Sequence, residues 1–216
     1  MGIKQSSPKN KSSETNKKVP MVCKPGMKIA VLGSGKVGVV FASGFVDLGH
    51  NVILASRKNK DEKGLEWIKS VNSSPLASIS DYVNAVKVSD IILLATAGMG
   101  TISAIEMAGG DSAFNGKIVI DATNPIDENF QLVGGVGTSN GETIQAKIPS
   151  AFVVKAWNHV GLECFYKPKP AVGIKPTMFI CGNDQGAKKR VSELLFDVGI
   201  LFFIFIFVFI YVIFYI

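Results

Sequence analysis

The chain has 216 residues, of which 47% are hydrophobic, and its formal net charge is +6. This length suits one domain, or one domain with a small appendage. Residues 1–26 contain six of the 23 basic residues and one of the 17 acidic residues, which leaves 17 basic and 16 acidic residues for 27–216. The positive charge therefore belongs to the N-terminal segment, and we expect no basic groove for nucleic acid in the remainder.

The cysteines and histidines argue against a metal centre. Cys23, Cys164 and Cys181 form no C-x-x-C pair and match no zinc pattern, and the whole chain has only two histidines. We therefore expect no metal site. Three unpaired cysteines also favour a reducing compartment, so we expect a cytoplasmic protein.

The N-terminal segment, residues 1–26, is rich in Ser, Lys and Asn, which predicts a disordered basic tail. It lacks the apolar core of a secretory signal, and its composition resembles a transit peptide except that Arg is absent. Residues 1–6 match the myristoylation pattern M-G-x-x-x-[ST], so acylation of Gly2 and a plain solvated tail are alternative interpretations. One acyl chain binds membranes weakly, so the nearby lysines would have to assist it.

The strongest pattern in the chain lies in residues 27–58. Met27–Leu32 is an apolar run typical of a strand that is buried on both faces, and the spacing G-x-G-x-x-G follows at once. Apolar residues at helical intervals over 39–48 and a second apolar run over 51–55 complete a strand–loop–helix–strand unit. This unit predicts a dinucleotide-binding site rather than a simple turn.

Each glycine of the loop has a distinct physical role at such a site. Gly33 would allow the tight turn, Gly35 would let the backbone approach a pyrophosphate, and Gly38 would let the helix pack closely on the strand. The N-terminus of the helix offers free N–H groups to the phosphates. The residues predicted to hold them are Gly33, Ser34, Gly35, Lys36, Val37 and Gly38.

The end of the second predicted strand indicates which dinucleotide is bound. NAD-binding units usually place Asp or Glu here to accept a hydrogen bond from the ribose 2′-hydroxyl. This chain instead has Ser56, Arg57 and Lys58, with Lys60 close behind, and its next acidic residue is Asp61. A hydroxyl followed by cations suits a 2′-phosphate, so we predict NADP(H). The alternative is a solvated basic loop.

The rest of the chain alternates between strands and helices. We expect helices over 62–71, 81–88, 101–108 and 187–198, strands over 73–80, 91–96, 117–121, 151–156 and 177–181, and a loop over 131–142. This alternation predicts an α/β fold of the doubly wound Rossmann type, with a mostly parallel sheet, over residues 27–199.

Two of these strands deliver further residues to the predicted site. Ala95 and Thr96 are the last residues of one strand, and Asn124 and Pro125 follow the next. The carboxyl ends of parallel strands meet at the edge where ligands of such sheets lie, so we expect these residues to contact the cofactor. Asn and Pro after a strand are also simple turn residues, which is the alternative.

Residues 27–199 resemble the NADP oxidoreductase family that includes the deazaflavin (coenzyme F420)-dependent NADP reductases. They resemble more loosely the amino-terminal domain of pyrroline-5-carboxylate reductases. The segments that support this resemblance are 33–38, 55–57, 121–125, 154–158 and 179–182. The resemblance implies the 2′-phosphate on Ser56 and Arg57, nicotinamide near Ala95 and Asn124, and a deazaflavin or flavin as hydride partner. The same fold forms the cytosolic half of six-transmembrane metalloreductases, so the acceptor does not follow from it.

The resemblance implies an NADP(H)-dependent oxidoreductase that acts on a deazaflavin, a flavin or another small molecule. Hydride transfer depends on alignment more than on a strong acid or base, and Asn158 and His159 are the polar residues expected near the acceptor. A structural role for His159 at a strand end is the alternative. Two other functions are a non-catalytic NADP-binding module and a membrane-tethered metalloreductase-like fragment. A homodimer is an open alternative for the assembly.

The atypical feature is the apolar C-terminal tail, residues 200–216, which contains only Ile, Leu, Phe, Val and Tyr. It has three interpretations: a translated non-coding stretch, a membrane anchor, or a last strand with an irregular end. As a helix it spans about 26 Å, slightly less than the roughly 30 Å hydrocarbon core. The basic residues 188–190 precede it, as expected for a cytoplasmic flank of a membrane-associated protein.

Overall fold

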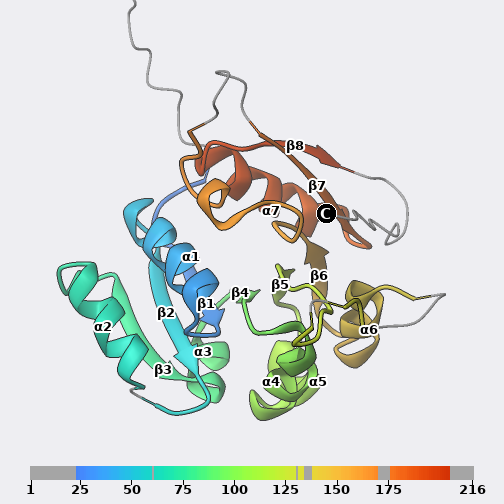
Figure 1. Cartoon of the computed structure of the whole chain (residues 1–216), viewed down its shortest axis with the longest axis horizontal. Coiled ribbons are helices and arrows are strands. Elements are labelled where there is room, and N and C mark those ends of the chain that lie inside the picture. The colour runs from blue at the N-terminus through green and yellow to red at the C-terminus, as the bar shows by residue number, and fades with distance from the viewer. Residues whose placement is uncertain (1–22, 60, 130, 134–137, 170–175, 205–216) are drawn as a thin grey trace, which may run out of the picture.

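The computed structural model describes residues 23–59, 61–129, 131–133, 138–169 and 176–204. Within these ranges the chain forms one eight-stranded sheet in the order β3-β2-β1-β4-β5-β6-β7-β8 (Figure 1). The strands are β1 (Lys28–Leu32), β2 (Asn51–Ser56), β3 (Ala77–Asp81), β4 (Ile91–Leu94), β5 (Ile118–Asp121), β6 (Phe152–Lys155), β7 (Thr177–Gly182) and β8 (Leu201–Ile204). All neighbouring pairs are parallel except β6 and β7, which are antiparallel.

Helices cover both faces of the sheet. They are α1 (Lys36–Asp47), α2 (Glu62–Ser70), α3 (Tyr82–Val88), α4 (Thr101–Met107), α5 (Gly110–Phe114), α6 (Asn140–Lys147) and α7 (Gln185–Asp197), with short 3-10 turns η1 (Gly98–Gly100) and η2 (Leu162–Cys164). Buried side chains of α1, α2 and α7 share one core cluster, and those of α3 to α6 share the other.

The apolar run of β1 explains why it occupies the centre. Ile29 and Val31 belong to the first cluster, and Ala30 and Leu32 belong to the second. Alternate residues of a strand point to opposite faces, so a continuous apolar run is buried on both sides. The predicted doubly wound, mostly parallel α/β fold is confirmed.

The strand order reverses between β1 and β4, which is where open α/β sheets hold their ligands in a crevice. The chain runs outward from β1 to β2 and β3, and then returns to β4 on the other side of β1. Ligands of open α/β sheets bind at such a point, beyond the carboxyl ends of the strands.

The structure corrects the loop predicted over residues 131–142, because α6 begins at Asn140. Ser139 and Glu142 form a capping box: Glu142 N–H donates to Ser139 Oγ (3.2 Å), and Ser139 N–H donates to Glu142 Oε2 (2.7 Å). This S-x-x-E pattern is a helix-start signal, and the surrounding glycines obscured it. The short helix α5 was also not predicted.

The N-terminal boundary lies earlier than expected. Cys23 is buried, and its N–H donates to Asp197 Oδ2 (2.8 Å), while Gly26 N–H donates to the Gly49 carbonyl (2.9 Å). Cys23 and Gly26 are therefore held on the domain by hydrogen bonds, although residues 24–26 are exposed, and the predicted disordered tail does not extend to residue 26. Gly2 and the rest of residues 1–22 lie outside the described residues.

The first residues of the apolar tail continue the sheet. β8 pairs in parallel with β7, and Leu201 N–H donates to the Pro176 carbonyl (2.9 Å). The last-strand interpretation thus describes residues 201–204, and residues 205–216 lie outside the described part of the chain. Among the helices that the structure describes, none is long and apolar enough to cross a membrane.

Candidate functional site

The glycine loop joins β1 to α1 at the crevice. Gly33 has φ +124°, and a Cβ atom there would lie 2.5 Å from the Ala95 carbonyl oxygen. A Cβ at Gly38 would lie 1.8 Å from the Gly33 carbonyl oxygen. Both glycines are therefore required by the fold itself: the first for its left-handed backbone and the second for the close approach of α1 to the loop.

Gly35, between them, meets no such restriction. It is the N-cap of α1 with an extended backbone, and a Cβ built on it would have no atom of the described residues within 4 Å. No side chain caps this helix end, and no acidic residue lies in its first turn. The N-terminus of α1 therefore faces open space with its partial positive charge, which fits an anion such as a pyrophosphate.

The other predicted loop residues surround this opening. Lys36 is the first residue of α1 and is exposed, and Val37 is half-buried. The proton of the Ser34 hydroxyl already has an acceptor, since the hydroxyl donates to Asp61 Oδ2 (2.5 Å).

At the end of β2, the predicted 2′-phosphate residues form a tight turn. Ser56 is buried, and its hydroxyl donates to the Lys58 carbonyl (2.5 Å). Arg57 and Lys58 are exposed. Gly33 N–H donates to the Ala55 carbonyl (2.9 Å), which joins the end of β2 to the glycine loop. Ser56 thus shapes the turn that presents the two cations. Lys60 lies outside the described residues.

Two residues in this region were not predicted from the sequence. Asp61 is the N-cap of α2, with Oδ1 accepting from Gly64 N–H (2.8 Å) while Oδ2 accepts from Ser34. Tyr82 is buried at the start of α3; burial raises the pKa of its hydroxyl, the charge of Arg57 lowers it, and the charge of Asp61 raises it. Both charges therefore act on Tyr82. Asp61 had a recognisable signal as an N-cap before a predicted helix.

The carboxyl ends of β4, β5 and β6 bring together the residues expected near nicotinamide. Asn124 Nδ2 donates to the Asn158 carbonyl (2.7 Å), and Asn158 Nδ2 donates to Asn124 Oδ1 (3.4 Å). A Cβ at Gly98 would lie 1.9 Å from the Asn124 carbonyl oxygen, so the loop after β4 also packs against this pair.

The two other residues predicted at this edge have defined contacts. The Thr96 and Thr101 hydroxyls lie 3.0 Å apart, which links the loop after β4 to α4. The Pro125 carbonyl accepts from Val133 N–H (2.7 Å) and fixes the loop after β5.

A buried ion pair lies under the Asn124–Asn158 pair. Lys155 Nζ is 2.8 Å from Asp121 Oδ2, and it also donates to the Thr123 carbonyl. Asp121 Oδ1 accepts from the Thr123 N–H (2.9 Å) and hydroxyl (2.6 Å). Asn140 Nδ2 donates to the Thr123 hydroxyl (2.9 Å), so the start of α6 joins the network. This network fixes the backbone just before Asn124, and sequence reasoning did not identify it.

His159 is tied to β7 rather than directed at the crevice. Its Nε2 accepts from Phe179 N–H (3.4 Å), and its ring stacks on Phe179 with centroids 5.6 Å apart. Burial lowers the pKa of His159, and a hydrogen bond with the Thr177 backbone opposes this shift. These contacts favour the structural alternative for His159.

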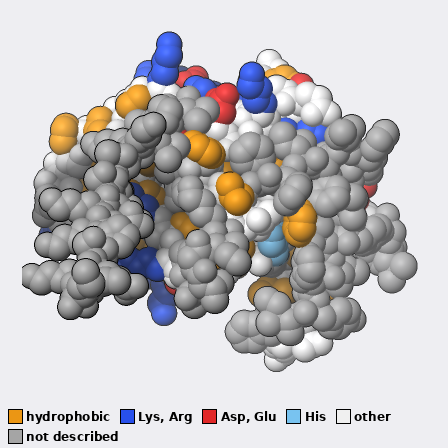
Figure 2. Space-filling model, turned by 90° about the horizontal axis from the view of Figure 1, so that it is seen from above, with side chains coloured by type: hydrophobic (Ala, Val, Ile, Leu, Met, Phe, Trp, Pro, Cys, Tyr) orange, Lys and Arg blue, Asp and Glu red, His pale blue; other side chains and the backbone are white. Residues whose placement is uncertain are grey.

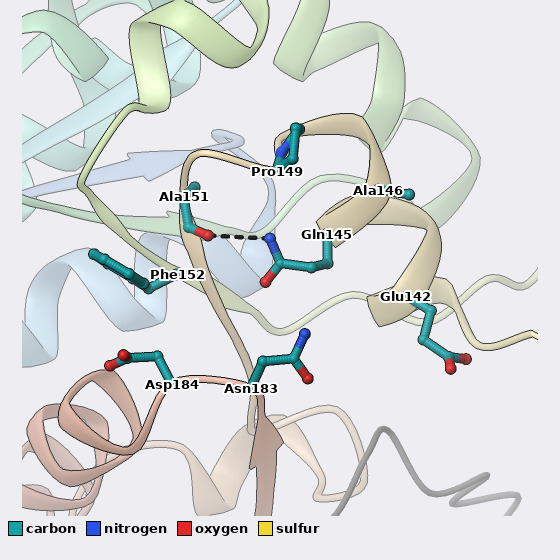
Figure 3. Close-up of a pocket in the computed structure, with 8 residues that line it drawn as sticks. All are labelled: Glu142, Gln145, Ala146, Pro149, Ala151, Phe152, Asn183 and Asp184. Atoms are coloured by element: carbon teal, nitrogen blue, oxygen red, sulfur yellow. Dashed lines mark hydrogen bonds between the residues drawn. The ribbon is translucent and has the colours of Figure 1, made fainter.

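A second feature of the described surface lies away from this edge of the sheet. An open hollow of about 730 Å³ lies between α6 and the turn before α7. Figure 3 shows Gln145 reaching from α6 toward Ala151, with Asn183 and Asp184 opposite. This hollow includes none of the predicted cofactor residues. Among the described side chains, no cluster of three or more His, Cys, Asp or Glu could hold a metal ion.

Comparison with known proteins identifies the family. The model of the family described as NADP oxidoreductase, coenzyme F420-dependent, matches residues 28–125. A protein of Arthrobacter sp. FB24, assigned as an F420-dependent NADP reductase, has a solved structure that is 31% identical. The match covers 84% of this chain and 86% of that one, with a TM-score of 0.74. The chain belongs to this family of NADP oxidoreductases.

Two further relatives of this family member differ in size and in similarity. Metalloreductase STEAP3 of Rattus norvegicus is 29% identical over 179 residues, and the match covers 82% of this chain but only 33% of the metalloreductase. The pyrroline carboxylate reductase of Plasmodium falciparum, solved with NADP bound, is 15% identical with a TM-score of 0.55; the match covers 83% of this chain and 59% of that one. The second likeness shows the fold alone.

Proposed function

We propose that this family member binds NADP(H) in the crevice and transfers a hydride between nicotinamide and a deazaflavin, a flavin or another small molecule. The observation that supports this most directly is Gly35, which faces open space at the N-terminus of α1 while Gly33 and Gly38 are closed by backbone contacts. Of the three glycines in the G-x-G-x-x-G pattern, only Gly35 is not required by a contact or a left-handed backbone among the described residues. A ligand that approaches the backbone closely would require glycine at position 35, because any side chain there would block its approach.

The charge around the end of β2 supports the choice of NADP(H) over NAD(H). Arg57 and Lys58 are exposed there, and Arg57 acts electrostatically on Tyr82 at the start of α3. A 2′-phosphate between β2 and α3 would bind the guanidinium through charge-assisted hydrogen bonds. NAD(H) has no group to use these cations.

The residues at the other half of the crevice would position the reacting ring. Bound NADPH supplies the hydride, and the chain has only to orient the ring and exclude water. The Asn124–Asn158 pair, supported from below by Lys155 and Asp121, provides amide groups that are fixed in direction. Ala95 and Thr96 form the adjoining wall after β4.

The test measures binding first and turnover second. We expect NADPH to bind more tightly than NADH, and Arg57→Ala to weaken NADPH about 10- to 150-fold with little effect on NADH. Lys189→Ala, on exposed α7 surface, is the matched control. Turnover is followed as loss of NADPH absorbance with FMN, FAD, a deazaflavin and a ferric chelate. Equal affinity for the two dinucleotides would contradict the NADP assignment.

Two other functions are separated by the same experiment. The similarity to metalloreductase STEAP3 favours a fragment that passes electrons to a flavin or a metal, which predicts turnover with the flavins or the ferric chelate. A non-catalytic NADP-binding module predicts NADPH binding without turnover of any acceptor.

The location and the assembly of the chain follow from the same proposal. We expect a cytoplasmic protein that binds a small-molecule substrate and no nucleic acid, either as a monomer or as a homodimer. In Figure 2, basic and acidic side chains lie close together along the upper edge of the face that is shown. Membrane association through acylated Gly2 or residues 200–216 remains the alternative.

A further inference from the structure

Asp61 is an acidic side chain placed between the two parts of the proposed phosphate site. Its carboxylate is half-buried, with Oδ2 held by the Ser34 hydroxyl of the glycine loop (2.5 Å). Oδ1 accepts from Gly64 N–H (2.8 Å) and caps α2. The turn after β2 is thereby fastened to the loop that follows β1.

The charge of Asp61 acts on the same place as the charge of Arg57. Tyr82 is subject to both: Arg57 lowers the pKa of its hydroxyl and Asp61 raises it. Arg57 directly follows β2 and Asp61 is the N-cap of α2 only four residues later, so a phosphate that binds Arg57 lies in the field of the Asp61 carboxylate as well. The phosphate and the Asp61 carboxylate are both negative and repel each other, and this repulsion opposes the attraction of the phosphate to the Arg57 guanidinium.

Ser34 adds a second conflict. Its hydroxyl has one proton to donate, and in this structure Asp61 accepts it. A dinucleotide phosphate at the glycine loop would need the same proton. Binding therefore requires Ser34 to exchange a charge-assisted hydrogen bond with Asp61 for one with the phosphate, which reduces the net gain.

We infer that Asp61 is a specificity-determining residue that lowers the affinity for NADP(H) and reduces its preference over NAD(H). The inference rests on the proposed NADP site. Binding of NADP(H) is weakened both by repulsion from Asp61 and by the loss of the Ser34 proton, because its 2′-phosphate would lie near Arg57 and its pyrophosphate near Ser34. NAD(H) lacks the 2′-phosphate, so its binding is weakened mainly by the loss of the Ser34 proton.

The substitution Asp61→Asn separates charge from structure. Asn is an equally good N-cap, and its carbonyl oxygen can still accept from Gly64 N–H. Its amide group would donate to Ser34 Oγ, which frees the Ser34 proton for a phosphate. The negative charge is removed while the cap is kept.

The experiment measures dissociation constants of NADPH and NADH for the full chain and for Asp61→Asn. We expect NADPH to bind about 3- to 10-fold more tightly to the variant and NADH to gain clearly less. The matched control is Asp184→Asn, which removes the same charge from the N-cap of α7, where Asp184 accepts from Ala187 N–H (2.7 Å). The control should change neither constant.

Three outcomes would overturn the inference: unchanged NADPH affinity in Asp61→Asn, weaker NADPH affinity, or an equal gain for NADPH and NADH. Asp61→Ser, which also keeps a capping hydroxyl, serves as the second variant if Asp61→Asn unfolds. A wild-type chain that binds neither dinucleotide would instead contradict the proposed function, so the two failures are distinguishable.

Discussion

Gly35 and Gly38 are three residues apart in one loop, yet the molecule needs them for different reasons. A Cβ at Gly38 would collide with the Gly33 carbonyl at 1.8 Å, so that glycine is needed for folding. A Cβ at Gly35 would touch nothing within 4 Å, and its backbone angles suit any residue. The glycine at position 35 therefore meets no packing requirement among the described residues, which is consistent with the proposed approach of a ligand to its backbone.

We predict that Gly35→Val abolishes NADPH binding and leaves the domain folded. The added side chain would fill the open space at the N-terminus of α1, where the pyrophosphate must approach. The measurements are NADPH titration, with an expected loss of at least about 100-fold, and thermal unfolding, with little expected change. Gly38→Val should instead destabilise the fold. NADPH affinity that survives in Gly35→Val would show that the loop is only a turn.

His50 is a second residue with an unusual environment. It is fully buried after α1, and neither ring nitrogen has a hydrogen-bond partner among the described residues. Burial lowers the pKa of His50 from its ordinary value of 6.5, the charge of Asp197 raises it, and that of Arg190 lowers it. The neutral ring is therefore favoured in the folded state.

This environment predicts a loss of stability in acid. The pKa of His50 is lower in the folded chain than in the unfolded chain, so the unfolded chain binds more protons below pH 6.5. The contribution of His50 is thus complete above about pH 6.5 and is lost as the pH falls through that value toward the folded pKa. Urea unfolding between pH 8 and pH 5 should show a smaller loss for His50→Phe than for the wild type. His159 shifts in the same direction, so a residual slope is expected.

At the scale of elements, the site depends on loops that three strands hold in register. β5 pairs with β4 on one side and β6 on the other, and the last residues of the three strands are paired with one another. The loops that follow the three strands therefore begin at the same level. Lys155 of β6 and Asp121 of β5 face each other directly, which is why their side chains can form an ion pair across the strands. The loop that contains Asn124 begins immediately beyond this pair.

We predict that Lys155→Met destabilises the chain by about 3–5 kcal/mol, because it leaves the Asp121 carboxylate buried without its cation. Asp121 is fully buried and Lys155 is 14% exposed, so water offers little compensation. The double variant Lys155→Met with Asp121→Asn should recover part of the loss in urea unfolding. If the double variant is no more stable than Lys155→Met, the ion pair is not the source of the effect.

At the scale of the whole molecule, the end of the chain is joined to the sheet through β8. Gly199, with φ +92°, follows α7, and Ile200 N–H donates to the Leu195 carbonyl (2.9 Å). This left-handed glycine ends the helix and turns the chain toward the edge of the sheet. β8 then adds a parallel strand beside β7.

We predict that a chain stopped after Ile204 binds NADPH as tightly as the full chain and stays folded. Residues 205–216 have no charge and no Pro, and their β-branched and aromatic residues favour aggregation or membrane association. Solubility, detergent dependence and NADPH affinity are compared for the full chain and chains stopped at Ile204 and Gly199. The chain stopped at Gly199 should be less stable, since it loses the pairing with β7. A soluble, monodisperse full chain would contradict the prediction for residues 205–216.

Local patterns in the sequence determined the fold and the place of the site. The apolar run of Met27–Leu32, the glycine spacing that follows and the absence of an acidic residue at the end of β2 are all contiguous features. They depend on the preferences of neighbouring residues, so they can be recognised without knowing what lies across the sheet. The helix α6 had a local signal as well, in its capping box, but adjacent glycines concealed it.

Contacts between distant residues were decided only by the tertiary structure. Ser34 and Asp61 are 27 positions apart, and Asp121 and Lys155 are 34 apart, so no spacing rule connects them. His159 contacts β7 because Phe179 lies beside it in the folded chain, and not because of any neighbour in sequence. The sequence by itself determined that a dinucleotide loop exists, because a turn and a helix start are local. The tertiary structure alone shows which side chains weaken or strengthen ligand binding at this loop, because these contacts depend on how the strands pair in the folded sheet.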